Sequence, residues 1–176
     1  MGQWTTLFGR TGAVLTISLG MAGLAMAEPQ GKQVGDNVVQ TSANGNAMVA
    51  ARKAALQSLD TFLFAARKKS DNWQSATLQV ALQREGAVER IWVSGFRRVA
   101  LARFQGRLAN EPHALPGLKH GDEVLFDRSQ IEDWAFIEAG RGYGFFGVRA
   151  LLPIMNDDQA EGMRAFLAPN PLPEGW

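Results

Sequence analysis

The stretch GDEVLFDRSQIEDWAFIEAGRGYGFFGVR, residues 121–149, combines alternating apolar residues with a dense group of glycines. Val124 and Phe126 occupy every second position before the alternation stops at residues 127–130. It resumes at Trp134 and continues through a glycine-rich turn. Period-two alternation that is broken by turn residues predicts a strand, a short turn or single helical turn, a second strand, a hairpin and a third strand.

The preceding residues extend this pattern into a sheet. Residues 77–83 alternate cleanly, residues 84–86 have the composition of a hairpin turn, and residues 88–94 return as a second strand. Residues 99–108 predict another strand or pair of strands, with Gly106 at a bulge or a sharp bend. Because each strand has one clearly apolar face, we expect an antiparallel sheet that is buried on one side.

A helix is expected to cover that sheet. Over residues 47–69, apolar residues that include Leu59 and Phe62 recur at the spacing of one helical face. Asn46 stands in the N-cap position. A last short helix is expected to follow acidic caps at residues 157–158. The fold class is therefore α+β: one long amphipathic helix on a curved antiparallel sheet of about five or six strands, either open or a partial barrel, plus a short C-terminal helix.

The N-terminus has the features of a secretory signal peptide. Arg10 supplies positive charge, residues 13–24 form an apolar run, and the Ala-Met-Ala sequence at 25–27 fits the small-x-small cleavage rule. An uncleaved anchor is the alternative, because residues 11–27 reach the short limit of a membrane span. The chain has no cysteine, so an exported form has neither disulfides nor a lipid-modified cysteine. We therefore expect a periplasmic or secreted protein with no stable membrane span after cleavage.

The sequence divides into four segments. These are a signal peptide over residues 1–27, a flexible linker over 28–46, a single α+β domain over 47–168, and a proline-rich tail over 169–176 that cannot be helical. The chain has 18 Lys and Arg against 17 Asp and Glu. Removal of the leader takes away Arg10 and leaves equal numbers of each sign, so the charge does not indicate a nucleic-acid partner.

Several short motifs together resemble a known family. They are Trp92-Val93-Ser94, Asn110-Glu111-Pro112, Gly121-Asp122, Ile131-x-Asp133-Trp134 and residues 144–149. This combination is similar to the YegJ-like bacterial family catalogued as domain of unknown function 2314, over residues 47–152. The resemblance implies a domain that is often exported. It implies no established reaction, cofactor or catalytic residue.

Two motifs that can indicate cofactors stand in settings that disfavour this use. Residues 142–147 match the dinucleotide-binding pattern G-x-G-x-x-G, but such a site needs a preceding βαβ unit and a long helix after the glycines. Pro153 leaves room for barely a turn of helix, so no nucleotide is expected. His113 and His120 lie on an irregular loop without metal-ligand spacing, and neither a metal nor another cofactor is expected.

Polar and aromatic residues near the strand ends form the candidate binding site. They are Asn110, Glu111, Asp127, Arg128, Asp133, Trp134 and Tyr143. If the breaks between strands meet at one rim of the sheet, these groups combine directional hydrogen bonds with an apolar surface, as binding sites do. Since no activated nucleophile or base is evident, the pattern favours a non-enzymatic binding or interaction module with an envelope ligand or protein partner.

Other functions stay open on the same residues. Asp127 and Asp133 form a carboxylate pair if they share a cleft, which is the arrangement of a cell-envelope hydrolase. An inhibitor or immunity-type partner protein is a third alternative. Asp127 would equally serve as a local turn cap, Trp134 as a core residue, and the basic residues 67–69 as complements of the helix dipole rather than as a docking patch.

Export predicts a definite N-terminus. Protein recovered from the periplasm or the medium is expected to begin at Glu28, because cleavage follows Ala27. Intact-mass spectrometry measures this directly. A cytoplasmic pool that keeps Met1 would contradict the prediction.

Overall fold

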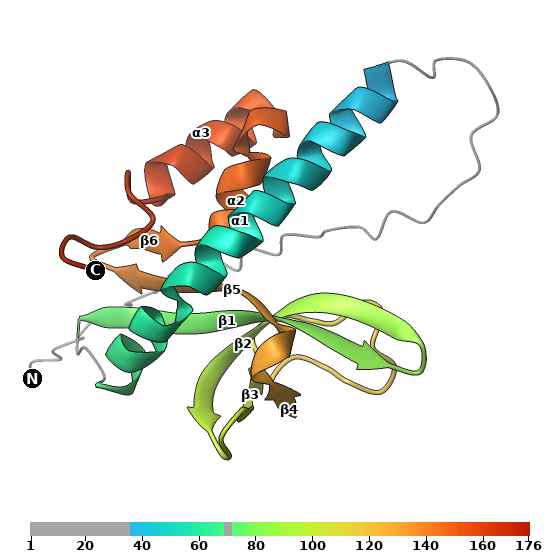
Figure 1. Cartoon of the computed structure of the whole chain (residues 1–176), viewed down its shortest axis with the longest axis vertical. Coiled ribbons are helices and arrows are strands. Elements are labelled where there is room, and N and C mark those ends of the chain that lie inside the picture. The colour runs from blue at the N-terminus through green and yellow to red at the C-terminus, as the bar shows by residue number, and fades with distance from the viewer. Residues whose placement is uncertain (1–35, 69–71) are drawn as a thin grey trace, which may run out of the picture. The chain divides into compact units, whose positions relative to one another are not determined.

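A computed structural model describes residues 36–68 and 72–176, and the expected signal peptide lies outside them. Six antiparallel strands form one sheet in the order β4-β3-β2-β1-β5-β6, and α1 lies across it (Figure 1). The strands are β1 (Trp73–Arg84), β2 (Ala87–Arg98), β3 (Arg103–Leu108), β4 (Glu123–Asp127), β5 (Ile131–Glu138) and β6 (Arg141–Gly144). The helices are α1 (Asp36–Arg67), α2 (Phe146–Leu151) and α3 (Asp157–Phe166), with short 3-10 turns η1 (Arg128–Gln130) and η2 (Leu152–Ile154). The α+β prediction is confirmed, and the sheet is open rather than closed into a barrel.

The long helix begins earlier than the sequence pattern predicted. α1 starts at Asp36 instead of residue 47, so part of the expected linker is helical and Asn46 does not cap it. Few apolar residues precede residue 47, and the amphipathic pattern therefore marks the part of α1 that packs on the sheet rather than its first turn. No helix in the described part of the chain is long and apolar enough to cross a membrane.

The β1–β2 hairpin closes at the predicted turn. Glu85 and Gly86 have φ values of 50° and 85°, and positive φ at both central residues matches the twist of two antiparallel strands. Gly106 lies opposite an irregularity in the β2–β3 pairing, as predicted. A Cβ at this position would lie 2.4 Å from the Val93 Cγ1, so the two strands approach closely only because residue 106 is glycine.

The core forms where α1 crosses the middle of the sheet. The row Leu108, Val93, Leu78 and Trp134 runs across β3, β2, β1 and β5, and all four side chains are buried. The ring of Phe62 stacks on Trp134 with 4.8 Å between centroids. The Trp134 Nε1 donates to the Ala55 carbonyl at 3.0 Å, which ties the indole to the helix backbone. Leu59 and Phe62 are buried, so the prediction that this helix covers the sheet is confirmed.

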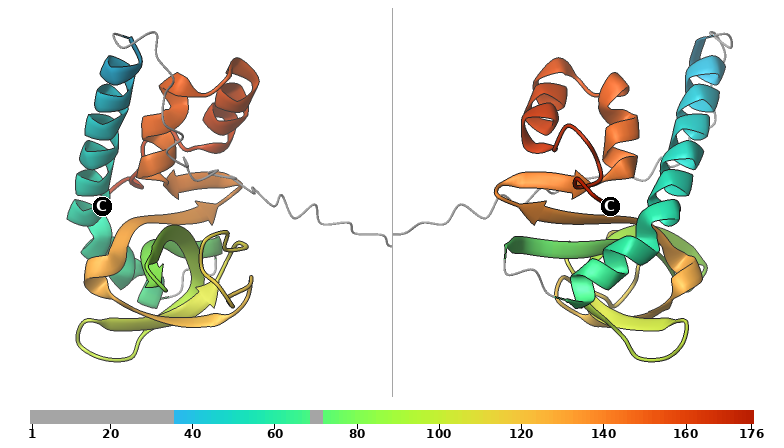
Figure 2. Two further views of the ribbon diagram at one scale, coloured as in Figure 1. Left: turned by 90° about the vertical axis from the view of Figure 1, so that its right-hand side faces the viewer. Right: turned by 60° about the vertical axis from the view of Figure 1, so that its left-hand side comes forward.

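The third strand predicted within residues 121–149 ends earlier than expected. β6 stops at Gly144, and the residues expected to continue the strand form α2 instead. Gly144 and Phe145 have φ values of 73° and 52°, and these left-handed conformations turn the chain out of the sheet. A Cβ on residue 144 would lie 2.2 Å from the Trp134 carbonyl oxygen, so only glycine fits. α2 then packs beside α1 at the β5–β6 end of the sheet (Figure 2).

The C-terminal segment folds back onto the domain. α3 is capped by Asn156, whose side chain accepts a first-turn backbone N–H at 2.9 Å, rather than by residues 157–158. Residues 169–176 contain no helix. The last residue, Trp176, packs against Trp134 with 5.7 Å between ring centroids. The proline-rich tail is therefore part of the packed domain.

Phe62→Ala is expected to lower the free energy of unfolding by about 3–5 kcal/mol, because it removes a fully buried ring that stacks on Trp134. Chemical denaturation measures the change. Thr61→Ala, an exposed position on the same helix, is the control. An equal unfolding free energy in both variants would show that α1 contributes little to the core.

Candidate functional site

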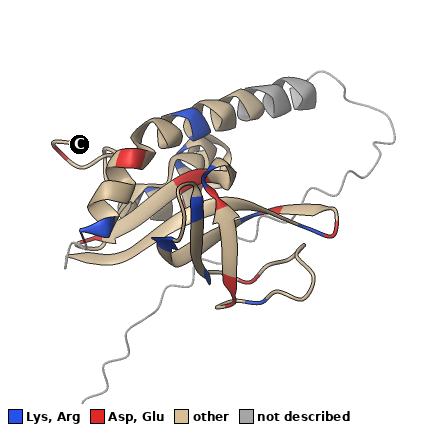
Figure 3. Ribbon diagram, turned by 60° about the horizontal axis from the view of Figure 1, so that its bottom comes forward, with Lys and Arg blue, Asp and Glu red and all other residues tan. Residues whose placement is uncertain are grey.

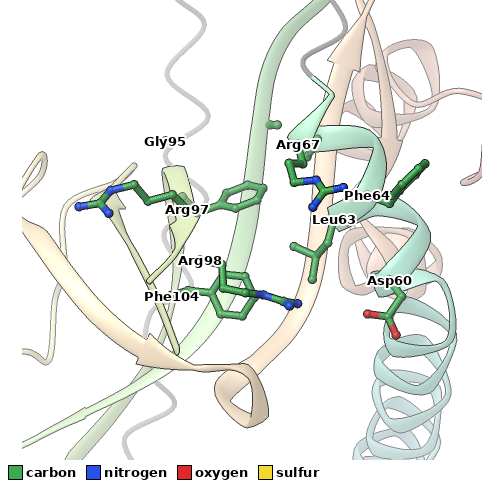
Figure 4. Close-up of a pocket in the computed structure, with 11 residues that line it drawn as sticks. Asp60, Leu63, Phe64, Arg67, Gly95, Arg97, Arg98 and Phe104 are labelled. Atoms are coloured by element: carbon green, nitrogen blue, oxygen red, sulfur yellow. The ribbon is translucent and has the colours of Figure 1, made fainter. Parts of the chain in front are cut away.

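A cavity of about 730 Å³ lies between the last turns of α1 and the strands β2 and β3 (Figure 4). We call it the α1 cavity. Its apolar wall includes Leu63 of α1, Phe96 of β2 and Phe104 of β3. Its polar lining residues are Asp60 and three arginines, Arg67, Arg97 and Arg98. The cavity therefore combines an apolar wall with positively charged groups.

A bulge in β2 shapes this cavity. Gly95 and Phe96 together lie opposite the single residue Gly106, so the pairing between β2 and β3 shifts by one residue. Gly95 adopts a φ of 57°, which glycine reaches without steric cost. Phe96 turns toward α1, and its ring centroid lies 5.7 Å from that of Phe62. The bulge thus links the cavity wall directly to the core beneath α1.

The arginines of the α1 cavity differ in orientation. Arg67 and Arg98 extend from α1 and β2 into the space between these elements, whereas Arg97 points away from it (Figure 4). The Arg97 guanidinium hydrogen-bonds the Gln105 side chain on β3. Among residues 36–68 and 72–176, no carboxylate lies within ion-pair distance of Arg67 or Arg98. Two guanidinium groups therefore face the cavity without an acidic partner in the described structure.

Asp60, the one carboxylate that lines the α1 cavity, is engaged elsewhere. It pairs with Arg128 of η1 at 2.9 Å, and this ion pair joins α1 to the turn between β4 and β5. Basic and acidic residues are otherwise interspersed along the ribbon (Figure 3). The positive character of the cavity is thus local, in a chain with a formal net charge of +1.

Two of the predicted site residues lie at a second, smaller cavity. Asp127 and Arg128 line a space of about 470 Å³ beside Leu56 and Leu59 of α1. Asp127 also pairs with Arg103 of β3 at 3.0 Å. Because Asp60 lines the α1 cavity and its partner Arg128 lines the smaller one, their ion pair marks the place where the two cavities approach each other.

Asn110 and Glu111 lie elsewhere, and the prediction of one shared rim is wrong. Asp127 is paired with the first residue of β3, whereas Asn110 and Glu111 follow the last residue of that strand. The antiparallel register therefore places the two groups at opposite ends of β3. The Asn110 Oδ1 accepts the Trp92 N–H at 3.0 Å, and the Glu111 Oε2 accepts the His120 N–H at 3.0 Å. Both side chains bond to the backbone of their own loop and the neighbouring strand.

The predicted aromatic residues belong to the packing of the domain. Trp134 is 0% exposed, so it offers no surface to a ligand, in agreement with the alternative that it is a core residue. Tyr143 is half-buried, and its ring stacks on Phe136 with 4.9 Å between centroids. Both rings contribute to the aromatic cluster at the β5–β6 end of the sheet.

Asp133 is buried at the start of α2. Its two carboxylate oxygens accept the backbone N–H groups of Trp134 and Gly147, each at 2.8 Å. Burial raises the pKa of Asp133 to about 6, against the opposing effects of these N–H donors, the Phe146 N–H and the positive charge of Arg149. The carboxylate occupies the N–H groups that a phosphate would need at this helix start, so the G-x-G-x-x-G residues serve local packing here.

The structure does not favour the carboxylate-pair alternative. Asp133 is 3% exposed with both oxygens occupied, while Asp127, the last residue of β4, is paired with Arg103. Neither carboxylate is free to act on a substrate together with the other. In the described part of the chain, no group of three His, Asp or Glu side chains lies close enough to hold a metal ion.

Sequence reasoning did not assign the residues of the α1 cavity to the site. The basic end of α1 was interpreted as complementing the helix dipole, and of that group Lys69 lies outside the described residues. Arg97 and Arg98 were assigned no role. The available signal was a basic run at residues 67–69, at the end of an amphipathic helix, and a basic pair at residues 97–98, after an aromatic residue. The bulge at Gly95 and Phe96 lies where arginines from both groups line one cavity.

The open antiparallel sheet, the helix that crosses it and the cavity beneath that helix define an α+β domain. Residues 45–165 match the model of the family described as "Uncharacterized protein conserved in bacteria (DUF2314)", and the chain belongs to this family, as its motifs predicted. It is similar to "Uncharacterized protein YegJ" of Escherichia coli strain K12, with 24% identity over 135 residues that make up 77% of this chain and 86% of that protein. No solved structure matches the chain.

The raised pKa of Asp133 predicts a characteristic pH dependence of stability. Between its unfolded pKa of about 3.9 and the folded value of about 6, the folded state binds more protons than the unfolded state, so stability falls as the pH rises. Relative to Asp133→Asn, which does not titrate there, the wild-type free energy of unfolding is expected to drop by about 2 kcal/mol from pH 4 to pH 7.

Urea denaturation of both proteins at four pH values between 4 and 7 tests this prediction. Asp133→Asn loses a hydrogen bond, which lowers its free energy of unfolding by the same amount at every pH. The test is therefore how the difference in unfolding free energy between the two proteins changes with pH. A difference that grows in favour of the wild type as the pH rises would contradict the prediction. It would mean that the N–H donors and Arg149 outweigh burial.

Proposed function

We propose that this protein is an exported, non-enzymatic binding module of the bacterial cell envelope, and that its ligand enters the α1 cavity. The observation that carries the proposal is the cavity itself, in which Arg67 and Arg98 face an apolar wall. Its volume of about 730 Å³ falls within the range of small-molecule sites, which are mostly apolar with a few placed polar groups.

The lining of the cavity favours binding over reaction. Of the described residues that line it, none is a Ser, Thr, Tyr, His or Lys. The only acidic one, Asp60, is held by Arg128. Covalent or acid–base catalysis needs a nucleophile or a proton-transferring group within reach of the reacting atom. Unpaired guanidinium groups beside aromatic rings instead hold an anion in place.

Support for an envelope location comes from the sequence. Residues 1–27 have the charged, apolar and small-residue regions of a signal peptide. A chain without cysteine gains no stability from disulfides in an oxidising compartment, and the extensive core between α1 and the sheet is consistent with stability from packing alone.

The proposal predicts that a matched pair of helix variants differs in ligand retention. Protein purified from the periplasm under native conditions is expected to carry a small-molecule adduct in native mass spectrometry. Ala66→Trp fills the α1 cavity and should abolish the adduct, because residue 66 lines it. Ala50→Trp, at an exposed position of the same helix, should retain the adduct. Equal adduct occupancy in the two variants, or none in the wild type, would contradict the proposed function.

A further inference from the structure

We propose that the α1 cavity selects a ligand with one anionic group, a carboxylate or a phosphate, on an apolar body. This inference rests on the proposed function, namely that a ligand enters this cavity, and it defines the chemistry of that ligand. Its basis is that two arginines from different elements line the same apolar cavity, and neither has an acidic partner among the described residues.

The structure neutralises several of its other arginines. Arg90, Arg103 and Arg128 each pair with a carboxylate, namely Glu132, Asp127 and Asp60. Arg67 and Arg98 have no such partner among the described residues, although they come from two different elements and both point into the cavity. A guanidinium is weakly hydrated and presents planar donors that match a carboxylate or phosphate. An anionic group between Arg67 and Arg98 would supply the missing partner.

The apolar wall of the cavity favours a ligand that carries an apolar body as well as a charge. Phe104 is 3% exposed, and Leu63 and Phe96 are half-buried beside it, so the wall is continuous with the core. The Arg98 guanidinium lies over the Phe104 ring with 5.5 Å to its centroid, which places positive charge directly against apolar surface. A bare anion would leave most of the 730 Å³ unfilled, whereas an aliphatic or aromatic body would cover this wall.

The position of Asp60 limits the ligand to one negative group. Asp60 lines the same cavity but lies seven residues before Arg67, which is about 10 Å along the helix axis. A second anionic group near Asp60 would meet its negative charge, which the pairing with Arg128 only partly offsets. The charge pattern therefore fits an amphiphile with one anionic head rather than a polyanion such as a nucleic acid.

Competition against an uncharged fluorescent probe tests this inference on the full mature chain. N-phenyl-1-naphthylamine reports occupancy of the cavity, and dodecanoate, dodecyl phosphate and 1-dodecanol are the competitors at pH 7.5. The two anionic compounds are expected to displace the probe at concentrations about tenfold lower than the alcohol, since charge-assisted hydrogen bonds strengthen their binding.

The arginine variants identify the origin of this preference. Arg67→Gln and Arg98→Gln should each weaken displacement by the anions about tenfold and leave displacement by the alcohol unchanged. Arg98→Lys should keep part of the effect, because it preserves the charge but not the planar donors. Arg164→Gln, at an exposed position of α3, is the control and should change nothing. Circular dichroism confirms that each variant is folded before the comparison.

Other results of the displacement experiments would contradict either the anionic ligand or the proposed function. Equal displacement by the anions and the alcohol, or unchanged displacement by the anions in both Gln variants, would overturn the anionic ligand but leave a cavity that binds apolar molecules. Probe binding that is absent, or that persists in Ala66→Trp, would overturn the proposed function itself. Binding to phosphatidylglycerol vesicles but not phosphatidylcholine vesicles, without displacement by free anions, would assign the arginines to a membrane surface instead.

Discussion

The stack of Phe62 on Trp134 is the contact on which the rest of the structure depends. It joins α1, the longest helix among the described residues, to β5 of the sheet, and the Trp134 Nε1 bond to the Ala55 carbonyl fixes the indole against that helix. Because a buried indole N–H needs an acceptor, this hydrogen bond restricts how α1 can lie on β5. The close approach of Gly144 and the packing of Trp176 on the same indole follow from that position.

The sequence predicted those parts of the fold that local patterns determine. The sequence predicted β1, β2 and the turn at Glu85 and Gly86. Strand alternation and turn type depend on residues that are adjacent in the sequence, so a local pattern is enough to identify them. The end of β6 was not found, since it depends on Phe145 adopting a left-handed conformation that aromatic residues rarely take. The early start of α1 was also missed, because residues 36–46 include few apolar residues and so leave no amphipathic signal.

The candidate site was harder to predict than the fold, because the polar residues that stood out in the sequence have structural partners. Asn110 bonds the backbone of β2, and Asp133 binds the first N–H groups of α2. Burying a carboxylate is costly unless backbone donors surround it, so a conspicuous acid in an apolar strand can mark a helix start rather than a reaction. Arg67 and Arg98 are unremarkable in the sequence, and they line one cavity beside the bulge in β2.

The buried charged groups of this domain have structural partners. Glu132, which is almost fully buried, is paired with both Arg52 and Arg90, and the buried side of Arg149 donates to three backbone carbonyls. In each case the fold itself supplies the partner, because a buried charge without one is strongly unfavourable. Exposed guanidinium groups at a cavity stay hydrated, so they do not incur the cost of burying a charge and can remain unpaired until a ligand binds. A ligand therefore gains the most binding free energy where an unpaired charge lies beside apolar surface, as it does in the α1 cavity.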